Sequence, residues 1–151
     1  MEITLRKLKK LDVYEKDKSE PVGKVKCICF SKEKNNVDAL YIETLSLIPL
    51  SKKVFIEEFG EISGDKLFLK EKISDKNIKN SREEDVSEEK VLGVYEKDRE
   101  KQKLYDMSFD FETGEIRSMV LKNGLFSKNN KVEIKNMHIK NNIIYIEGKE
   151  K

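Results

Sequence analysis

The sequence predicts an all-β protein built from two small units, and two observations point to this fold class. Short apolar runs alternate with polar residues, and turn residues separate them at intervals of roughly 8–12 residues, which is typical of antiparallel sheets. The second observation is an internal repeat, because residues 94–98 and residues 13–17 both read Val-Tyr-Glu-Lys-Asp. An identical pentapeptide followed by matched apolar positions indicates a duplicated unit.

Each copy of the unit is organised around a predicted hairpin. In the second copy, residues 103–116 read as a strand, a tight turn at 112–114 (Glu-Thr-Gly) and the start of a returning strand. Residues 22–42 follow the same course in the first copy. Four apolar positions coincide at one constant offset: Phe30 with Phe109, Val37 with Ile116, Leu40 with Met119, and Ile42 with Leu121.

The remaining elements of the first unit follow from apolar spacing and turn residues. Residues 3–14 predict a strand, a break and a second strand, with a helix through Leu5, Leu8 and Leu11 as the alternative. Pro21 ends a turn at 17–21, because proline cannot donate within a central ladder. Strands are then expected at 22–30, 37–43, 54–56 and 67–69, with an irregular crossing at 45–50 and a turn at 63–66.

The segment 71–90 is expected to be a charged linker between the units 1–70 and 91–151. Its apolar residues are Ile73, Ile78 and Val86, too few to offset the entropy lost on ordering it, although a short solvated helix near 83–90 is an alternative. The second unit then repeats the first. Val132 and Ile134 correspond to Val54 and Ile56, Ile144 and Ile146 to Leu67 and Leu69, and Asn141-Asn142 to the Gly64-Asp65 turn.

Composition excludes several classes of protein. The chain has 31 basic and 29 acidic residues, and no segment is strongly basic, which argues against a nucleic-acid binder. Such counts do not describe surfaces, so they leave a local basic face open. No signal-peptide core and no run of about 18–20 apolar residues is present, and two cysteines in one strand cannot form a disulfide framework. We expect a soluble cytoplasmic protein without a membrane span.

Both units carry the residues of a known family pattern. In the first copy these are Val13-Tyr14, Gly-Lys-Val-Lys at 23–26, and Phe30; in the second they are Val94-Tyr95, residues 106–110 and residues 112–115. Each unit resembles a PRC-barrel domain, the small β-barrel shared by the photosynthetic reaction centre H subunit and the C-terminal domain of the ribosome maturation factor. The resemblance implies two tandem barrels with docking or assembly roles, and it supplies no catalytic residues.

No catalytic, cofactor or metal site is predicted. Cys27 and Cys29 should share one strand face as small buried residues, since a zinc site needs about four ligands and the single histidine, His138, lies in the other copy. His138 has no predicted catalytic partner. The acidic residues near the central turn, Asp106, Asp110 and Glu112, are expected to bond backbone N–H groups rather than a cation.

The sequence therefore favours a non-enzymatic interaction or assembly module, bacterial and cytoplasmic, with an unidentified protein partner. Association with RNA or the ribosome is the alternative. The residues selected for the interaction are the apolar groups beside two turns, Leu47, Ile48, Leu50, Leu125 and Phe126, which would otherwise only cap the open ends of the barrels.

The hairpin alignment predicts that Phe30 and Phe109 occupy equivalent buried positions. Replacing Phe109 with alanine should lower the free energy of unfolding by about 3–5 kcal/mol, because a large core side chain would leave a cavity. Thermal or urea denaturation of Phe109→Ala measures the loss. An unchanged melting temperature would mean that this strand faces the opposite way.

Overall fold

The chain is all-β in a computed structural model that describes residues 1–32, 35–71, 85–97, 99–123 and 129–150. Among these residues, no helix has the length and apolar character needed to cross a membrane. The elements in chain order are β1 (Glu2–Thr4), α1 (Leu5–Leu8), β2 (Asp12–Tyr14), β3 (Gly23–Ser31), β4 (Val37–Thr44), β5 (Ser51–Phe55), η1 (Ile56–Glu58), β6 (Phe59–Ser63), β7 (Lys66–Leu69), β8 (Asp85–Ser87), η3 (Glu88–Lys90), β9 (Gly93–Glu96), β10 (Lys103–Asp110), β11 (Ile116–Lys122), β12 (Asn130–Lys140) and β13 (Ile143–Gly148).

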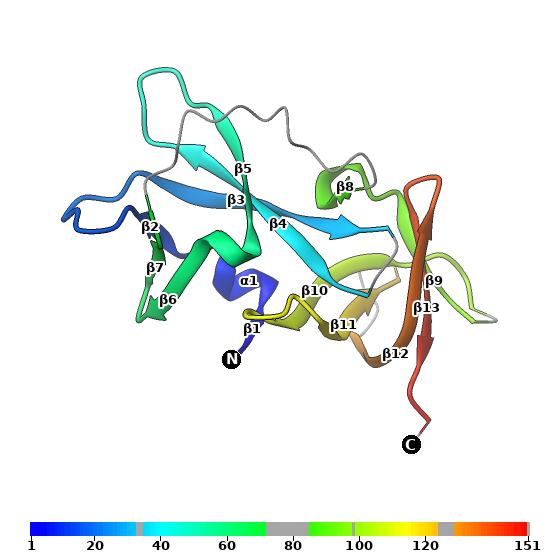
Figure 1. Cartoon of the computed structure of the whole chain (residues 1–151). Helices are drawn as coiled ribbons and strands as arrows, with labels where there is room; N and C mark the ends of the chain where they lie inside the picture. Colours follow the sequence, from blue (N-terminus) through cyan, green and yellow to red (C-terminus); the bar gives the residue numbers. More distant parts are fainter. Residues whose placement is uncertain (33–34, 72–84, 98, 124–128, 151) are drawn as a thin grey trace.

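The described strands form two sheets (Figure 1). The first has the order β5-β4-β3-β2-β7-β6, with β8 paired to β3 beside this path. The second has the order β1-β10-β11-β12-β13-β9. Antiparallel pairing predominates, and each sheet also contains one parallel pair, β2–β7 in the first and β13–β9 in the second.

Neither sheet closes into a barrel, so the expected tandem barrels are not confirmed. In the first sheet, the end strands β5 and β6 are consecutive in the chain, but the 3-10 helix η1 turns the backbone between them. In the second sheet, β12 runs unbroken through the corresponding region, and the opening lies between β9 and β10. There the described residues form one isolated bridge, Val94–Gln102. Each sheet therefore remains open at a different connection.

Strand register bears out the duplication of the hairpin. Phe30 pairs with Val37, and Phe109 pairs with Ile116, as the constant offset predicts. Both hairpins contain two register shifts at equivalent positions. Phe30 and Phe109 are fully buried, which confirms the predicted orientation of both strands. Further equivalent pairs are Ile28–Leu40 with Met107–Met119, and Val25–Ile42 with Leu104–Leu121.

The two sheets exchange their short N-terminal strands. Strand β1 pairs with β10 of the second sheet, and β8 pairs with β3 of the first. The described end of the expected linker, residues 85–90, is therefore structured as β8 and η3, whereas residues 72–84 lie outside the described residues. A single apolar side chain is sufficient here, because Val86 is buried opposite Phe30 and the edge of β3 provides backbone partners.

Residues 3–14 combine the two alternatives that the sequence left open. The expected strands are present as β1 and β2, and the break between them is the one-turn helix α1. Thr4 begins this helix, because its Oγ1 accepts a hydrogen bond from the Lys7 N–H at 3.2 Å. Leu5 and Leu8 are buried, so the helix is short but anchored in the core.

Most predicted turns lie where the sequence placed them. Asn141 and Asn142 have φ values of 53° and 62°, which suits the two-residue hairpin between β12 and β13. Gly64 supplies the corresponding left-handed residue between β6 and β7, with φ 61°. Residues 45–50 form the expected irregular connection between β4 and β5.

The turns of the two central hairpins bind each other. The Val37 N–H donates to the Gly114 carbonyl at 2.7 Å, and the Ile116 N–H donates to the Asn35 carbonyl at 2.9 Å. These four positions are equivalent in the two copies, so the contact has the reciprocal form of a two-fold interface. One continuous apolar core extends through both sheets, and it includes Phe59 against Phe111 with ring centroids 5.9 Å apart.

Gly114 should be essential for this contact. It has φ 80°, and a Cβ at this position would lie 2.1 Å from the Val37 carbonyl oxygen. Gly64 is the matched control, because it has φ 61° but nothing within 4 Å of an added Cβ. We expect Gly64→Ala to lower the free energy of unfolding by about 1–2 kcal/mol through backbone strain, and Gly114→Ala by at least about 1 kcal/mol more through the clash. Chemical denaturation of both variants measures this difference, and equal losses would contradict a close approach at Gly114.

Candidate functional site

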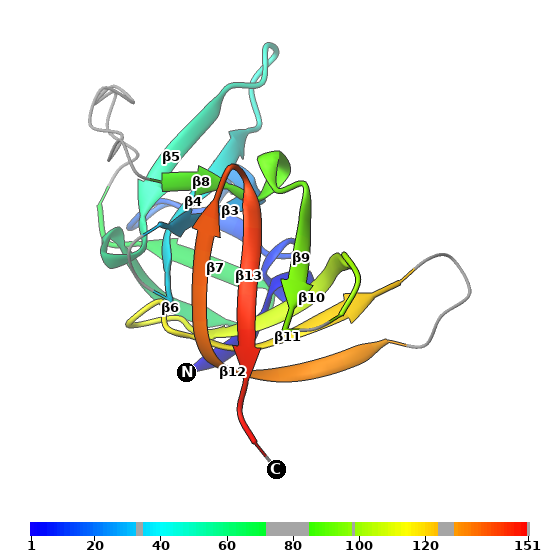
Figure 2. The same cartoon turned by 90° about the vertical axis from the view of Figure 1, so that its right-hand side faces the viewer.

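Apolar side chains gather at the β4–β5 loop, residues 45–50. Leu45, Leu47, Ile48 and Leu50 are 58%, 104%, 77% and 55% exposed. The loop projects beyond the sheets in both views of the molecule (Figures 1 and 2). Only 37% of the residues are hydrophobic, and four large aliphatic side chains exposed together on such a protein are typical of a binding surface.

Hydrogen bonds at the base of the loop fix its shape. The Thr44 N–H donates to the Leu50 carbonyl at 2.9 Å, and Thr44 Oγ1 accepts from the Leu50 N–H at 3.0 Å. Within the loop, Ser46 Oγ donates to the Ile48 carbonyl at 2.6 Å. The apolar side chains are thus presented by a closed, internally bonded turn, which lowers the entropy lost when a partner binds.

Charges of both signs flank the β4–β5 loop. Lys24 and Glu43 are direct partners in the β3–β4 ladder, and Lys24 Nζ also lies 3.3 Å from Asp12 Oδ1. Lys26 Nζ donates to Ser51 Oγ at 3.4 Å. The base of the loop therefore has no single-sign field.

Three of the five residues selected from the sequence lie in this loop, namely Leu47, Ile48 and Leu50. The other two, Leu125 and Phe126, lie outside the described residues. Leu45 belongs to the same exposed cluster but was not selected. The sequence Leu45-Ser46-Leu47 could have identified it, because alternate residues of an extended segment point to the same side.

Cys27 and Cys29 are buried beneath β8, in agreement with the default expectation. Cys27 Sγ lies 3.6 Å from Ser87 Oγ, and Cys29 pairs with Ser87 in the β3–β8 ladder. Burial raises the pKa of Cys29 to about 12 and also raises the pKa of Cys27. Among the described residues, no group of three or more His, Cys, Asp and Glu side chains could hold a metal ion. Desolvation outweighs the opposing effects of Lys9 on Cys27 and of Lys53 on Cys29, so neither thiol is activated.

A buried ion pair beside the cysteines escaped sequence analysis. Lys53 Nζ lies 2.7 Å from Asp85 Oδ2, and the two side chains are 4% and 5% exposed. The pair joins β5 to β8, which are far apart in the chain. Because removing one partner of a buried ion pair leaves an uncompensated charge, the pair holds β8 in one position. Its signal was hidden, since β8 lay in the segment expected to be a linker.

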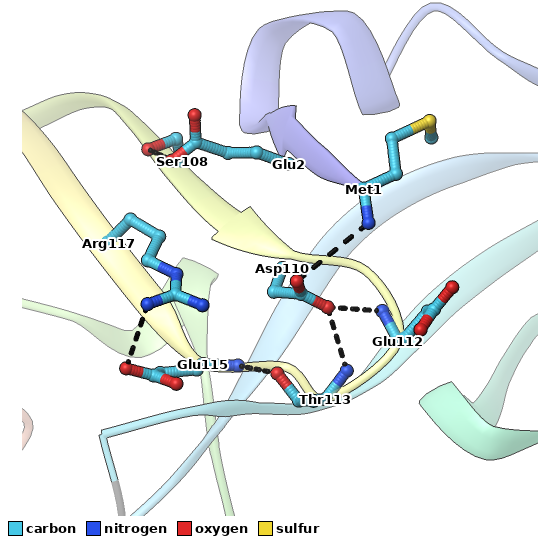
Figure 3. Close-up of polar contacts among 8 residues, drawn as sticks. All are labelled: Met1, Glu2, Ser108, Asp110, Glu112, Thr113, Glu115 and Arg117. Carbon is cyan, nitrogen blue, oxygen red and sulfur yellow. Dashed lines mark hydrogen bonds and ion pairs between the residues drawn. The ribbon is translucent and has the colours of Figure 1, made fainter.

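Two of the three acidic residues named from the sequence, Asp106 and Asp110, bond backbone N–H groups as predicted; the contacts of Asp110 are shown in Figure 3. Asp110 Oδ1 accepts from the N–H groups of Glu112 at 2.9 Å and Thr113 at 3.1 Å. These bonds, led by that of Thr113, lower the pKa of Asp110. Asp106 Oδ1 accepts from the N–H groups of Arg6 and Met107, so it also fastens α1 to β10. The Asp110 and Asp106 carboxylates therefore have structural roles.

His138 lies on the exposed face of β12 and begins a row of stacked rings. Its ring is 5.0 Å from that of Tyr145 at 11°, and Tyr145 is 5.7 Å from Tyr95 at 15°. The three residues are aligned by direct strand pairing across β12, β13 and β9. Among these three residues, sequence analysis considered only His138 as a candidate, because the row depends on a parallel pairing that local patterns do not specify.

No protein-family model matches the chain, and no curated protein matches its sequence.

The buried thiols should be inert in the folded protein. A thiolate is the reactive form, and a pKa near 12 leaves about one thiolate in 10,000 at pH 8 for Cys29. We expect Ellman's reagent to label neither cysteine within minutes at pH 8, and to label both once the protein is denatured. Rapid labelling of the native protein would show that β8 does not cover them in solution.

Proposed function

We propose that the chain is a non-enzymatic interaction module of the bacterial cytoplasm that binds a partner protein through the β4–β5 loop. The observation that carries this proposal is the set of four exposed aliphatic side chains, Leu45, Leu47, Ile48 and Leu50, on a loop with its own hydrogen bonds. Burying one fully exposed side chain of this kind contributes about 1.5–3 kcal/mol, so the loop offsets part of the entropy lost on association.

The charges around the loop favour a protein over a lipid surface. Insertion into an anionic leaflet is assisted by a collar of Lys and Arg. Here Lys24 faces Glu43 across the ladder and Asp12 from β2. A mixed rim around an apolar centre is the usual composition of a protein–protein interface.

A pair of PRC-barrel-like units is the architecture that we propose for this module. The two copies share the hairpin register, and they also share the parallel pairs, with Val13 opposite Leu67 and Val94 opposite Ile144. Members of the resembled family act in assembly and docking, which agrees with an exposed loop as the working surface.

The loop is tested by the double variant Leu47→Asp with Ile48→Asp. Both side chains are exposed, so the free energy of unfolding should change by less than about 0.5 kcal/mol while partner binding falls at least tenfold. Tagged protein captures partners from nuclease-treated lysate, and the affinity of each identified partner is then measured with purified proteins.

Leu92→Asp is the matched control, because Leu92 is 63% exposed and lies outside the loop. It should bind like the wild type. Equal binding by the double variant and the wild type would reject the β4–β5 loop as the docking surface. Loss of the complex on nuclease treatment would indicate a nucleic-acid bridge instead.

A further inference from the structure

A cluster of cations surrounds Tyr105 on the second sheet. The guanidinium carbon of Arg6 lies 3.8 Å from the centroid of the Tyr105 ring, and Lys122 Nζ lies 4.7 Å from it. Tyr105 falls at a register shift between Leu104 and Asp106, so it has no Cα partner in the β10–β11 ladder. The bulge displays the ring beside both cations. We call Arg6, Lys103, Tyr105 and Lys122 the basic face.

Like charges oppose each other within the basic face. Lys103 and Lys122 are direct partners in the β10–β11 ladder, an arrangement that destabilises an antiparallel pair. The first copy provides an internal comparison, because the equivalent partners there are Lys24 and Glu43, which have opposite charges. The duplicated scaffold accepts a carboxylate at this position, and the second copy has a lysine instead.

Carboxylates do not neutralise this cluster in the part of the chain that the structure describes. The ion pairs formed there involve other cations, and none includes Arg6, Lys103 or Lys122. The nearby Asp106 accepts two backbone hydrogen bonds, from Arg6 and Met107. The three cations outnumber the Asp106 carboxylate beside them, and this excess positive charge at a repulsive register position favours an anionic ligand.

Aromatic rings lie on β9 and its neighbours, and β9 is bridged to the segment that leads into β10. Val94 and Gln102 exchange two backbone hydrogen bonds of 2.9 Å, which hold the segment leading into β10 against β9. The stem of Lys101 lies across Gly93, where an added Cβ would meet Lys101 Cδ at 2.6 Å. Because side chains alternate along a strand, half-buried Tyr95 faces outward next to the fully buried Val94. Tyr95 is also the end of the stacked row that contains Tyr145 and His138.

We propose that this surface binds single-stranded nucleic acid. Arg6, Lys103 and Lys122 would contact phosphates, and the outward rings would stack on bases. Sequence-tolerant binding of single strands combines cations that follow the backbone with aromatic stacking platforms, and both components lie on the second sheet here. The local grouping of cations explains how a chain of net charge +2 can present such a surface. The site lies on the second sheet, whereas the proposed docking loop lies on the first, so the two proposals are independent.

The decisive variant is Lys122→Glu. It gives Lys103 a carboxylate partner like that of Lys24, so the melting temperature should stay the same or rise while affinity falls at least tenfold. Binding is measured by fluorescence polarisation of labelled 12-nucleotide oligouridylate and oligothymidylate at about 50 mM salt. Lys16→Glu, an exposed lysine of the first unit with the same charge change, should leave affinity within about twofold.

Salt dependence and a ring variant test the two components separately. With three phosphate contacts, the slope of log affinity against log salt should be about −2 for the wild type and smaller for Lys122→Glu. His138→Ala should weaken binding severalfold without changing this slope. The proposal is overturned if no oligonucleotide binds at 100 μM protein, if Lys122→Glu binds like the wild type, if a duplex binds at least as tightly, or if pyrophosphate or polyglutamate binds the same surface as tightly.

Discussion

Two backbone hydrogen bonds between the turns of the central hairpins set the arrangement of the whole molecule. They join Val37 to Gly114 and Ile116 to Asn35, and they require a glycine because the opposing carbonyl leaves no room for a Cβ. Once the turns meet reciprocally, each hairpin presents its free edge to the strand that precedes the other hairpin. The shared core and the exchange of β1 and β8 both follow from this contact.

Apolar alternation and turn residues predicted the repeated part of the fold well. The pairing of Phe30 with Val37 and of Phe109 with Ile116, and the Asn141-Asn142 turn, are local properties that a sequence encodes directly. The exchange of strands was missed, because a three-residue strand such as β8 owes its position to a distant free edge rather than to its own pattern. The predicted closure of each barrel is not confirmed for a similar reason. The helix η1 and the isolated Val94–Gln102 bridge depend on tertiary contacts, which local patterns do not encode.

The candidate surfaces differ in how far sequence could predict them. The β4–β5 loop was found because consecutive apolar residues beside Pro49 are visible in a single segment. The basic face was invisible, since Arg6, Lys103 and Lys122 become neighbours only through the β10–β11 register and the docking of α1 on β10. Duplication then allowed the two copies to diverge: one register position holds Glu43 in the first copy and Lys122 in the second.

The exchange of short strands also has a consequence for synthesis of the chain. Glu2 and its partner Ser108 are 106 residues apart, so β1 leaves the ribosome long before β10 exists. The edge of β3 likewise stays unpaired until β8 has been synthesised. During this interval two nascent chains on one messenger expose complementary strands and edges, and each can complete the other's sheet instead of its own. The strand exchange that joins the two halves of one molecule therefore also permits domain swapping between neighbouring nascent chains on a polysome.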